Sequence, residues 1–83
     1  MNEDKILNQL EKIGSFKNTT VGFNKDKNIY DVYARIRGDE EETKDILNEI
    51  KGLDYTYCDF GIFEFWFTPE DANKVIDRLK EEF

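Results

Sequence analysis

The sequence predicts an α+β fold: a two-layer sandwich in the order α-ββ-α-ββ-α, with a four-stranded antiparallel sheet and helices on one face. Three segments carry apolar residues at helical spacing, and two pairs of segments between them show the alternation of strands. The links within each pair are too short for a parallel crossover, which favours antiparallel hairpins. A chain of 83 residues is sized for one domain, here residues 1–83.

The first helix is predicted over residues 2–14, NEDKILNQLEKIG, where Gly14 can end the helix and the buried face recurs at helical spacing. A hairpin follows, with strands at Thr19–Phe23 and Ile29–Arg37 joined by the turn-rich NKDKN. Alternation assigns four residues of the second strand to the inner face. They are Tyr30, Val32, Ala34 and Ile36.

The second helix is predicted over residues 39–52, DEEETKDILNEIKG, with Asp39 as the N-cap and Glu42 three residues later. The stretch LDYTYCDFGIFEFWF then predicts two strands with a tight turn near Asp59–Gly61; one long strand bulged at Gly61 is the alternative. The third helix is predicted to begin at Thr68. Its apolar face comprises Ala72, Val75, Ile76, Leu79 and Phe83.

The two halves of the chain resemble each other. KILNQLEKIG is similar to DILNEIKGLD, and two strands and a helix follow each of them. This pattern predicts a weak internal αββ repeat over residues 3–37 and 43–68. A chance likeness between two amphipathic helices is the alternative.

Charge and composition narrow the choice of partner. The net charge of −7 is divided unevenly: residues 1–37 sum to +2 (seven Lys/Arg, five Asp/Glu) and residues 38–83 to −9 (five against fourteen). An acidic surface repels phosphate backbones and favours a basic protein partner over nucleic acid. A lone cysteine is typical of the reducing cytoplasm, and no apolar run suggests a secretion signal or a membrane span.

The sheet face turned away from the helices is predicted to carry Tyr33, Arg35 and Trp66. We expect the adjacent strand to add Tyr55 and Tyr57, because Cys58 suits a core position better. Aromatic residues and arginine are enriched at protein-binding hot spots. The same residues can instead stabilise an exposed sheet through cross-strand pairs. Single-stranded RNA also stacks on such faces, but the charge and the absence of an RNA-recognition pattern argue against it.

A second candidate surface lies at the start of the second helix, in Glu40, Glu41, Glu42 and Asp45. Acids at a helix N-terminus are favourable, but this cluster is larger than capping requires. A negative face of this kind could mimic a phosphate backbone and occupy the basic groove of a nucleic-acid-processing protein. A solvated helical surface without a partner is the alternative.

Catalysis is not expected. The chain has no histidine, Cys58 has no histidine partner, and no glycine-rich phosphate loop is present. Asp59–Gly61 reads DFG, a kinase tripeptide, but the remaining kinase motifs are missing. The sequence also lacks the ligand spacing of calcium or zinc sites. We therefore predict no enzymatic activity, no cofactor and no metal.

In size, acidity and lack of catalytic groups, the chain is similar to small inhibitors of phages and mobile elements, among them anti-CRISPR and anti-restriction proteins. The likeness is one of composition and includes no motif. It implies a cytoplasmic inhibitor or adaptor that binds a basic protein stoichiometrically. The alternatives are a homodimer formed through the sheet face, or an antitoxin or immunity protein. The predicted partner-binding residues are Glu40, Glu41, Glu42, Asp45, Tyr33, Arg35, Tyr57 and Trp66.

Overall fold

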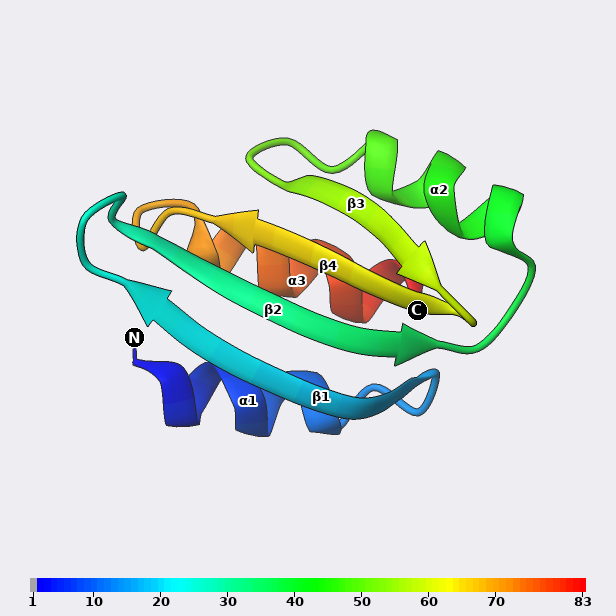
Figure 1. The fold of residues 1–83 in the computed structure, drawn as a ribbon, viewed down its shortest axis with the longest axis horizontal. Helices are drawn as coiled ribbons and strands as arrows, with labels where there is room; N and C mark the ends of the chain where they lie inside the picture. Colours follow the sequence, from blue (N-terminus) through cyan, green and yellow to red (C-terminus); the bar gives the residue numbers. More distant parts are fainter. Residues whose placement is uncertain (1) are drawn as a thin grey trace.

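The computed structural model describes residues 2–83 and has the predicted element order (Figure 1). The elements are α1 (Glu3–Glu11), β1 (Phe16–Asn24), β2 (Ile29–Ile36), α2 (Glu40–Asn48), β3 (Asp54–Asp59), β4 (Ile62–Phe67) and α3 (Ala72–Glu82). The strands form one antiparallel sheet in the order β1-β2-β4-β3. In Figure 1, α1 and α3 lie behind the sheet, and α2 lies beside β3 at its edge. The predicted α+β class and antiparallel sheet are confirmed.

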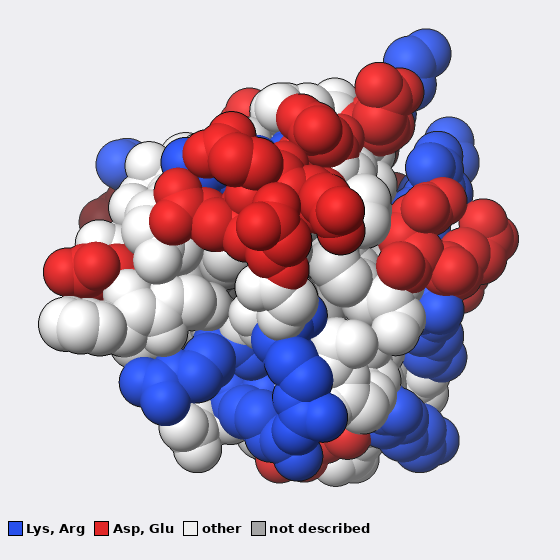
Figure 2. Space-filling model, turned by 90° about the vertical axis from the view of Figure 1, so that its right-hand side faces the viewer, with Lys and Arg blue, Asp and Glu red and all other residues white. Residues whose placement is uncertain are grey.

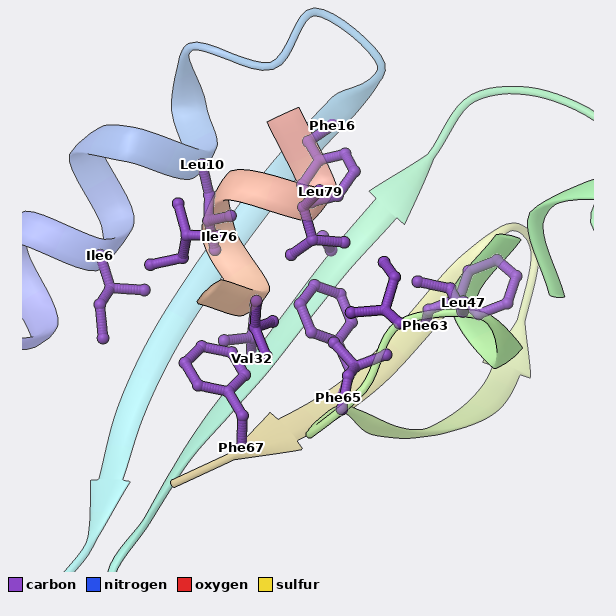
Figure 3. Close-up of a cluster of buried hydrophobic side chains, with 14 of the residues drawn as sticks. Ile6, Leu10, Phe16, Val32, Leu47, Phe63, Phe65, Phe67, Ile76 and Leu79 are labelled. Carbon is purple, nitrogen blue, oxygen red and sulfur yellow. The ribbon is translucent and has the colours of Figure 1, made fainter. Parts of the chain in front are cut away.

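The centre of the core is the aromatic stripe of β4. Phe63, Phe65 and Phe67 are all almost fully buried, and Val32 of β2 lies opposite Phe65 in the sheet register. Figure 3 shows these side chains meeting residues from all three helices. Burying one such side chain stabilises the fold by about 1.5–3 kcal/mol, so this stripe is a main source of stability. The helical contacts come from Ile6, Leu10, Leu47, Ile76 and Leu79.

The helix starts depend on side-chain caps. Asn2 Oδ1 accepts a hydrogen bond from the Lys5 amide at 2.9 Å, and Asp39 Oδ2 accepts one from the Glu42 amide at 3.1 Å, as predicted for α2. The predicted start of α3 at Thr68 is wrong. Thr68 caps a separate turn, and the first helical hydrogen bond runs from the Val75 amide to the Asp71 carbonyl at 2.9 Å.

Strand β1 is longer than predicted because a bulge interrupts its alternation. The register slips by one residue between Lys17 and Thr20, and Asn18 there has a φ of 53°. Because of this slip, the residues before the bulge do not continue the inward–outward alternation of the rest of the strand, and the sequence pattern does not reveal them as strand. Phe16, at the start of the strand, is buried with its ring centroid 6.1 Å from that of Phe65.

The prediction that Tyr55 and Tyr57 lie on the open face of the sheet is wrong. Tyr57 pairs with Phe63 in the register, and both tyrosines are half-buried on the core side. A bulge after Tyr57 leaves Cys58 exposed. The tyrosine rings bury more apolar area on the core side than the Cys58 thiol would. The Tyr57 hydroxyl still has a hydrogen bond there, because it accepts one from the Gly61 amide at 3.0 Å.

The β3–β4 hairpin turns through two residues of positive φ, Phe60 at 52° and Gly61 at 79°. Asp59 pairs with Ile62 across this turn, and its side chain accepts a hydrogen bond from the Phe60 amide at 3.0 Å. Such mirror-image turns favour Asn-Gly. The Phe60 side chain is 79% exposed, so it gains little burial in return for a left-handed backbone that costs about 1–2 kcal/mol.

We therefore expect Phe60→Asn to raise the free energy of unfolding by about 1 kcal/mol, because asparagine tolerates the left-handed conformation. Urea denaturation followed by circular dichroism measures this. Phe60→Ala is the matched control: it removes the ring but keeps a β-carbon at positive φ, and its stability should stay close to that of the wild type. A less stable Phe60→Asn variant would show that the ring, not the backbone, governs this position.

Candidate functional site

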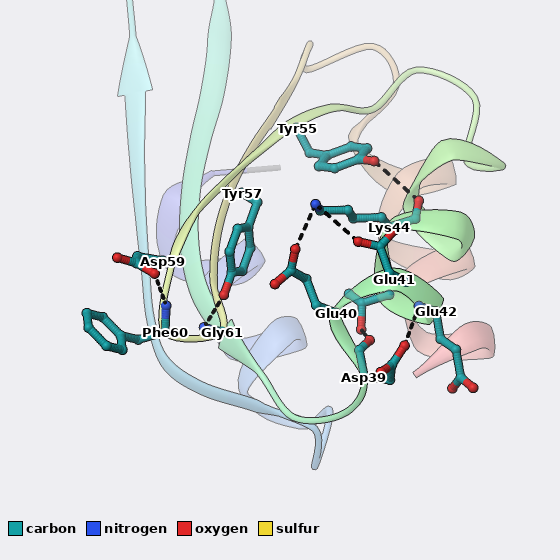
Figure 4. A network of polar contacts seen from close by, with 11 residues as sticks. Asp39, Glu40, Glu41, Glu42, Lys44, Tyr55, Tyr57, Asp59, Phe60 and Gly61 are labelled. Atoms are coloured by element: carbon teal, nitrogen blue, oxygen red, sulfur yellow. Dashed lines mark hydrogen bonds and ion pairs between the residues drawn. The ribbon is translucent and has the colours of Figure 1, made fainter.

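The acidic α2 face consists of Glu40, Glu41, Glu42 and Asp45, as predicted from the sequence. The side chain of Glu41 is 77% exposed, and Glu42 and Asp45 are also exposed. Lys44 forms ion pairs with Glu40 at 2.8 Å and Glu41 at 3.7 Å (Figure 4). Within residues 2–83, neither Glu42 nor Asp45 has an ion pair. The face therefore retains uncompensated negative charge.

Lys44, the only basic residue within α2, is held toward the sheet. Its ammonium group lies 5.2 Å from the centre of the Tyr57 ring, a cation–π distance. The hydrogen bond to Glu40 raises the pKa of Lys44. Tyr57 thus contributes by holding this cation and does not lie on the open face where it was predicted. The ammonium group of Lys44 therefore lies between α2 and the tyrosines of β3 and does not point outward with the exposed acids (Figure 4).

Charge is segregated at the end of the molecule that carries the start of α2 and the β3–β4 turn. Figure 2 shows this end with acidic side chains gathered in its upper part, where Figure 1 places α2. Lysine and arginine side chains gather below them. In the middle of this view the acidic group therefore lies above a basic group, whereas the two kinds of charge are mixed along its margins.

The second candidate is the outer sheet face, the side of β2 and β4 that no helix covers in Figure 1. The register brings its residues together in adjacent pairs: Asp31 with Trp66, Tyr33 with Glu64, and Arg35 with Ile62. Tyr33 is 42% exposed and Trp66 is half-buried. The structure thus brings three predicted site residues onto one surface, namely Tyr33, Arg35 and Trp66.

Asp31, on the same face, is not among the predicted site residues, but its carboxyl group lies in an unfavourable environment. Burial and the neighbouring Glu64 raise the pKa of Asp31 to about 6. Its Oδ1 atom is buried without a hydrogen-bond partner in the described chain. A hydrogen bond to Glu64 likewise raises the pKa of Tyr33. Asp31 and Glu64 become diagonal neighbours only through the β2–β4 register, which no local pattern in the sequence reveals.

Two shallow depressions flank Asp31. One of about 310 Å³ is lined by residues of the β1–β2 hairpin together with Glu64 and Trp66. The other, of about 400 Å³, lies on the opposite side of Asp31 and includes Gly22. The residues that line these depressions include no nucleophile paired with a general base. The depressions are therefore better suited to receive a protruding side chain of a partner than to catalyse a reaction.

Within residues 2–83, no group of three or more Asp, Glu, Cys or His side chains is arranged to hold a metal ion. In the same range, none of the helices has both the length and the apolar character needed to cross a membrane. Comparison of the chain with protein families, with curated proteins and with solved structures finds no significant match.

The raised pKa of Asp31 predicts a pH-dependent effect of Asp31→Asn. An acid whose pKa is higher in the folded than in the unfolded state makes the protein lose stability as pH rises from about 4 to about 6. Asparagine removes this loss, so the variant should have a higher Tm than the wild type at pH 7, with a smaller difference at pH 4.

Thermal unfolding at the two pH values measures the difference. Glu11→Gln, at an exposed position of α1, controls for the loss of one negative charge anywhere on the chain. An equal gain in Tm from Asp31→Asn at both pH values would contradict the prediction.

Proposed function

We propose that the chain is a non-enzymatic inhibitor or adaptor that binds a partner with a basic surface stoichiometrically through the acidic α2 face. The observation that carries this proposal is the surplus of exposed acid on one helix. Asp39 caps the helix, and Lys44 compensates Glu40 and Glu41 in part. Glu42 and Asp45 serve neither purpose within the described chain, so their charge is available to a partner.

The electrostatics favour a protein target over a nucleic acid. Residues 38–83 carry −9 against +2 for residues 1–37, so the half that contains α2 repels phosphate backbones and attracts basic surfaces. Complementary charge accelerates encounter and selects partners. A groove that binds nucleic acid offers such a surface. The negative charge of the acidic α2 face therefore favours a chain that inhibits a nucleic-acid-processing protein by binding its basic groove. Anti-CRISPR and anti-restriction proteins inhibit proteins of this kind.

Phe60 supplies an apolar contact in this proposal. Figure 4 shows its side chain pointing outward from the hairpin tip, and Figure 1 places that tip at the same end of the molecule as the start of α2. A ring that is 79% exposed on a left-handed backbone is not explained by folding. Aromatic residues are typical anchors of interfaces, where charged residues form the rim.

The decisive test is affinity capture from the native host and its competitor cells, with wild-type and charge-reversed chains as baits. The α2 variant carries Glu41→Lys, Glu42→Lys and Asp45→Lys. It should lose the partner that the wild type retains, because like charges then face each other. The wild-type complex should also weaken at least tenfold between about 0.1 and 0.5 M NaCl. The Debye screening length is about 10 Å at the lower concentration and shorter at the higher one, so added salt weakens the attraction between exposed charges.

The matched control carries Glu3→Lys, Asp4→Lys and Glu11→Lys on α1, which changes the net charge by the same amount and also reverses two first-turn acids. It should retain the partner. Equal loss with both baits would show that net charge, not the acidic α2 face, governs binding. Retention by the α2 variant would rule this face out.

A further inference from the structure

We infer that the outer sheet face is a dimer interface whose occupant is a second copy of this chain. The inference does not depend on the proposed function, because it concerns a different surface from the acidic α2 face. It stands on three observations: the separation of acidic and basic residues on β1, β2 and β3, the hollows beside Asp31, and the half-buried Trp66.

The outer sheet face has one acidic and one basic end. At the acidic end, Asp31, Trp66 and Asp54 lie side by side on β2, β4 and β3. At the basic end, Lys17 of β1 lies beside Arg35 of β2. Within residues 2–83, Asp31, Asp54, Lys17 and Arg35 form no ion pairs, although Lys27 lines the depression beside Asp31 and Asp59 pairs with Ile62 at the basic end.

A two-fold axis that runs across the strands, level with Tyr33 and Glu64, brings unlike ends together. It places Asp31 of each copy over Arg35 of the other, and Trp66 over Ile62. Every contact occurs twice, as closed two-fold symmetry requires. The same operation lays β2 on β2 and β4 on β4, which is the aligned packing of two sheets.

The shapes of the two ends also correspond. The acidic end has depressions of about 310 and 400 Å³ on either side of Asp31. The basic end presents the long, exposed side chains of Lys17 and Arg35. Space is open above Gly22, the β1 neighbour of Asp31, and this is where the symmetry places Lys17 of the second copy.

A second copy also resolves the unfavourable position of Asp31. Its buried Oδ1 lacks a donor, and burial together with the neighbouring Glu64 raises the pKa of the carboxyl. Lys27 lines the same depression but forms no ion pair with Asp31 in the described chain. The guanidinium of Arg35 from the other copy would bring the opposite charge beside this carboxylate and offset the repulsion from Glu64, whereas the enclosed Oδ1 stays within its own chain.

The interface is small, and it contains repulsive contacts. Four strands about 4.8 Å apart, with roughly 20 Å of each exposed, give a face of about 400 Å² per copy, so the dimer buries about 800 Å² in total, below the about 1,200 Å² of stable specific interfaces. The axis sets Glu64 against its own copy, and Asp54 against Asp59 at the β3 rim. We therefore expect a dissociation constant of about 1–100 µM, because small interfaces with unpaired charge bind weakly.

Sedimentation velocity over about 1–300 µM tests the dimer, and the emission of Trp66, the only tryptophan, should shift to the blue as the dimer forms. Arg35→Glu should raise the dissociation constant at least tenfold. Asp31→Arg should do the same. A mixture of the two variants should restore a 1:1 dimer, because Asp31 then meets Arg35 at one contact and Glu at 35 meets Arg at 31 at the other.

Glu64→Gln should tighten the dimer several-fold by removing like charge at the axis. Lys74→Glu, on the exposed side of α3, is the control and should leave the dissociation constant unchanged. Asp31→Lys replaces Asp31→Arg if that variant does not fold. A wild-type chain that stays monomeric at 300 µM overturns the inference. So does a dimer that is insensitive to Arg35→Glu, or a mixture that remains monomeric.

Discussion

The antiparallel pairing of β2 with β4 is the constraint on which the rest of the structure depends. It joins two hairpins into one sheet and sets Val32 opposite Phe65, which places the aromatic stripe of β4 under the helices. The same register decides the outer sheet face, because neighbouring residues of an antiparallel pair point to the same side. A slip of one residue would exchange the two faces, so burial of the phenylalanines also fixes the placement of Asp31, Tyr33 and Arg35.

The two candidate surfaces differ in how their charge is arranged. On α2, the acids gather on one helix, and the single lysine of that helix is drawn toward the ring of Tyr57. On the outer sheet face, Asp31 and Arg35 occupy opposite ends of β2, with Asp54 of β3 at the acidic end and Lys17 of β1 at the basic end. The first pattern is complementary to a basic partner, whereas the second is complementary to itself.

Some positions are less favourable than folding alone requires. Phe60 adopts a left-handed backbone with its ring in solvent, and Asp31 has a buried oxygen without a donor. Each is a local cost that the sequence could have avoided with Asn at the turn or a neutral side chain on β2. Such departures from local consistency are expected where a surface serves binding. They lie at the hairpin tip and on the outer sheet face, the places that the two proposals use.

The sequence by itself determined the order of the elements, the buried stripes of β2 and α3, and the N-cap of α2, because each depends on spacing within one segment. It also located the acids of α2, which are adjacent along the chain. Only the tertiary structure decided which way β3 faces, where β1 begins, and which charges meet across the sheet. Bulges at Asn18 and Cys58 shift the alternation, and the contact between Asp31 and Glu64 depends on two strands that are distant in sequence. Patterns within one segment carry no information about a bulge or about the register of two strands, because both depend on the pairing with the partner strand.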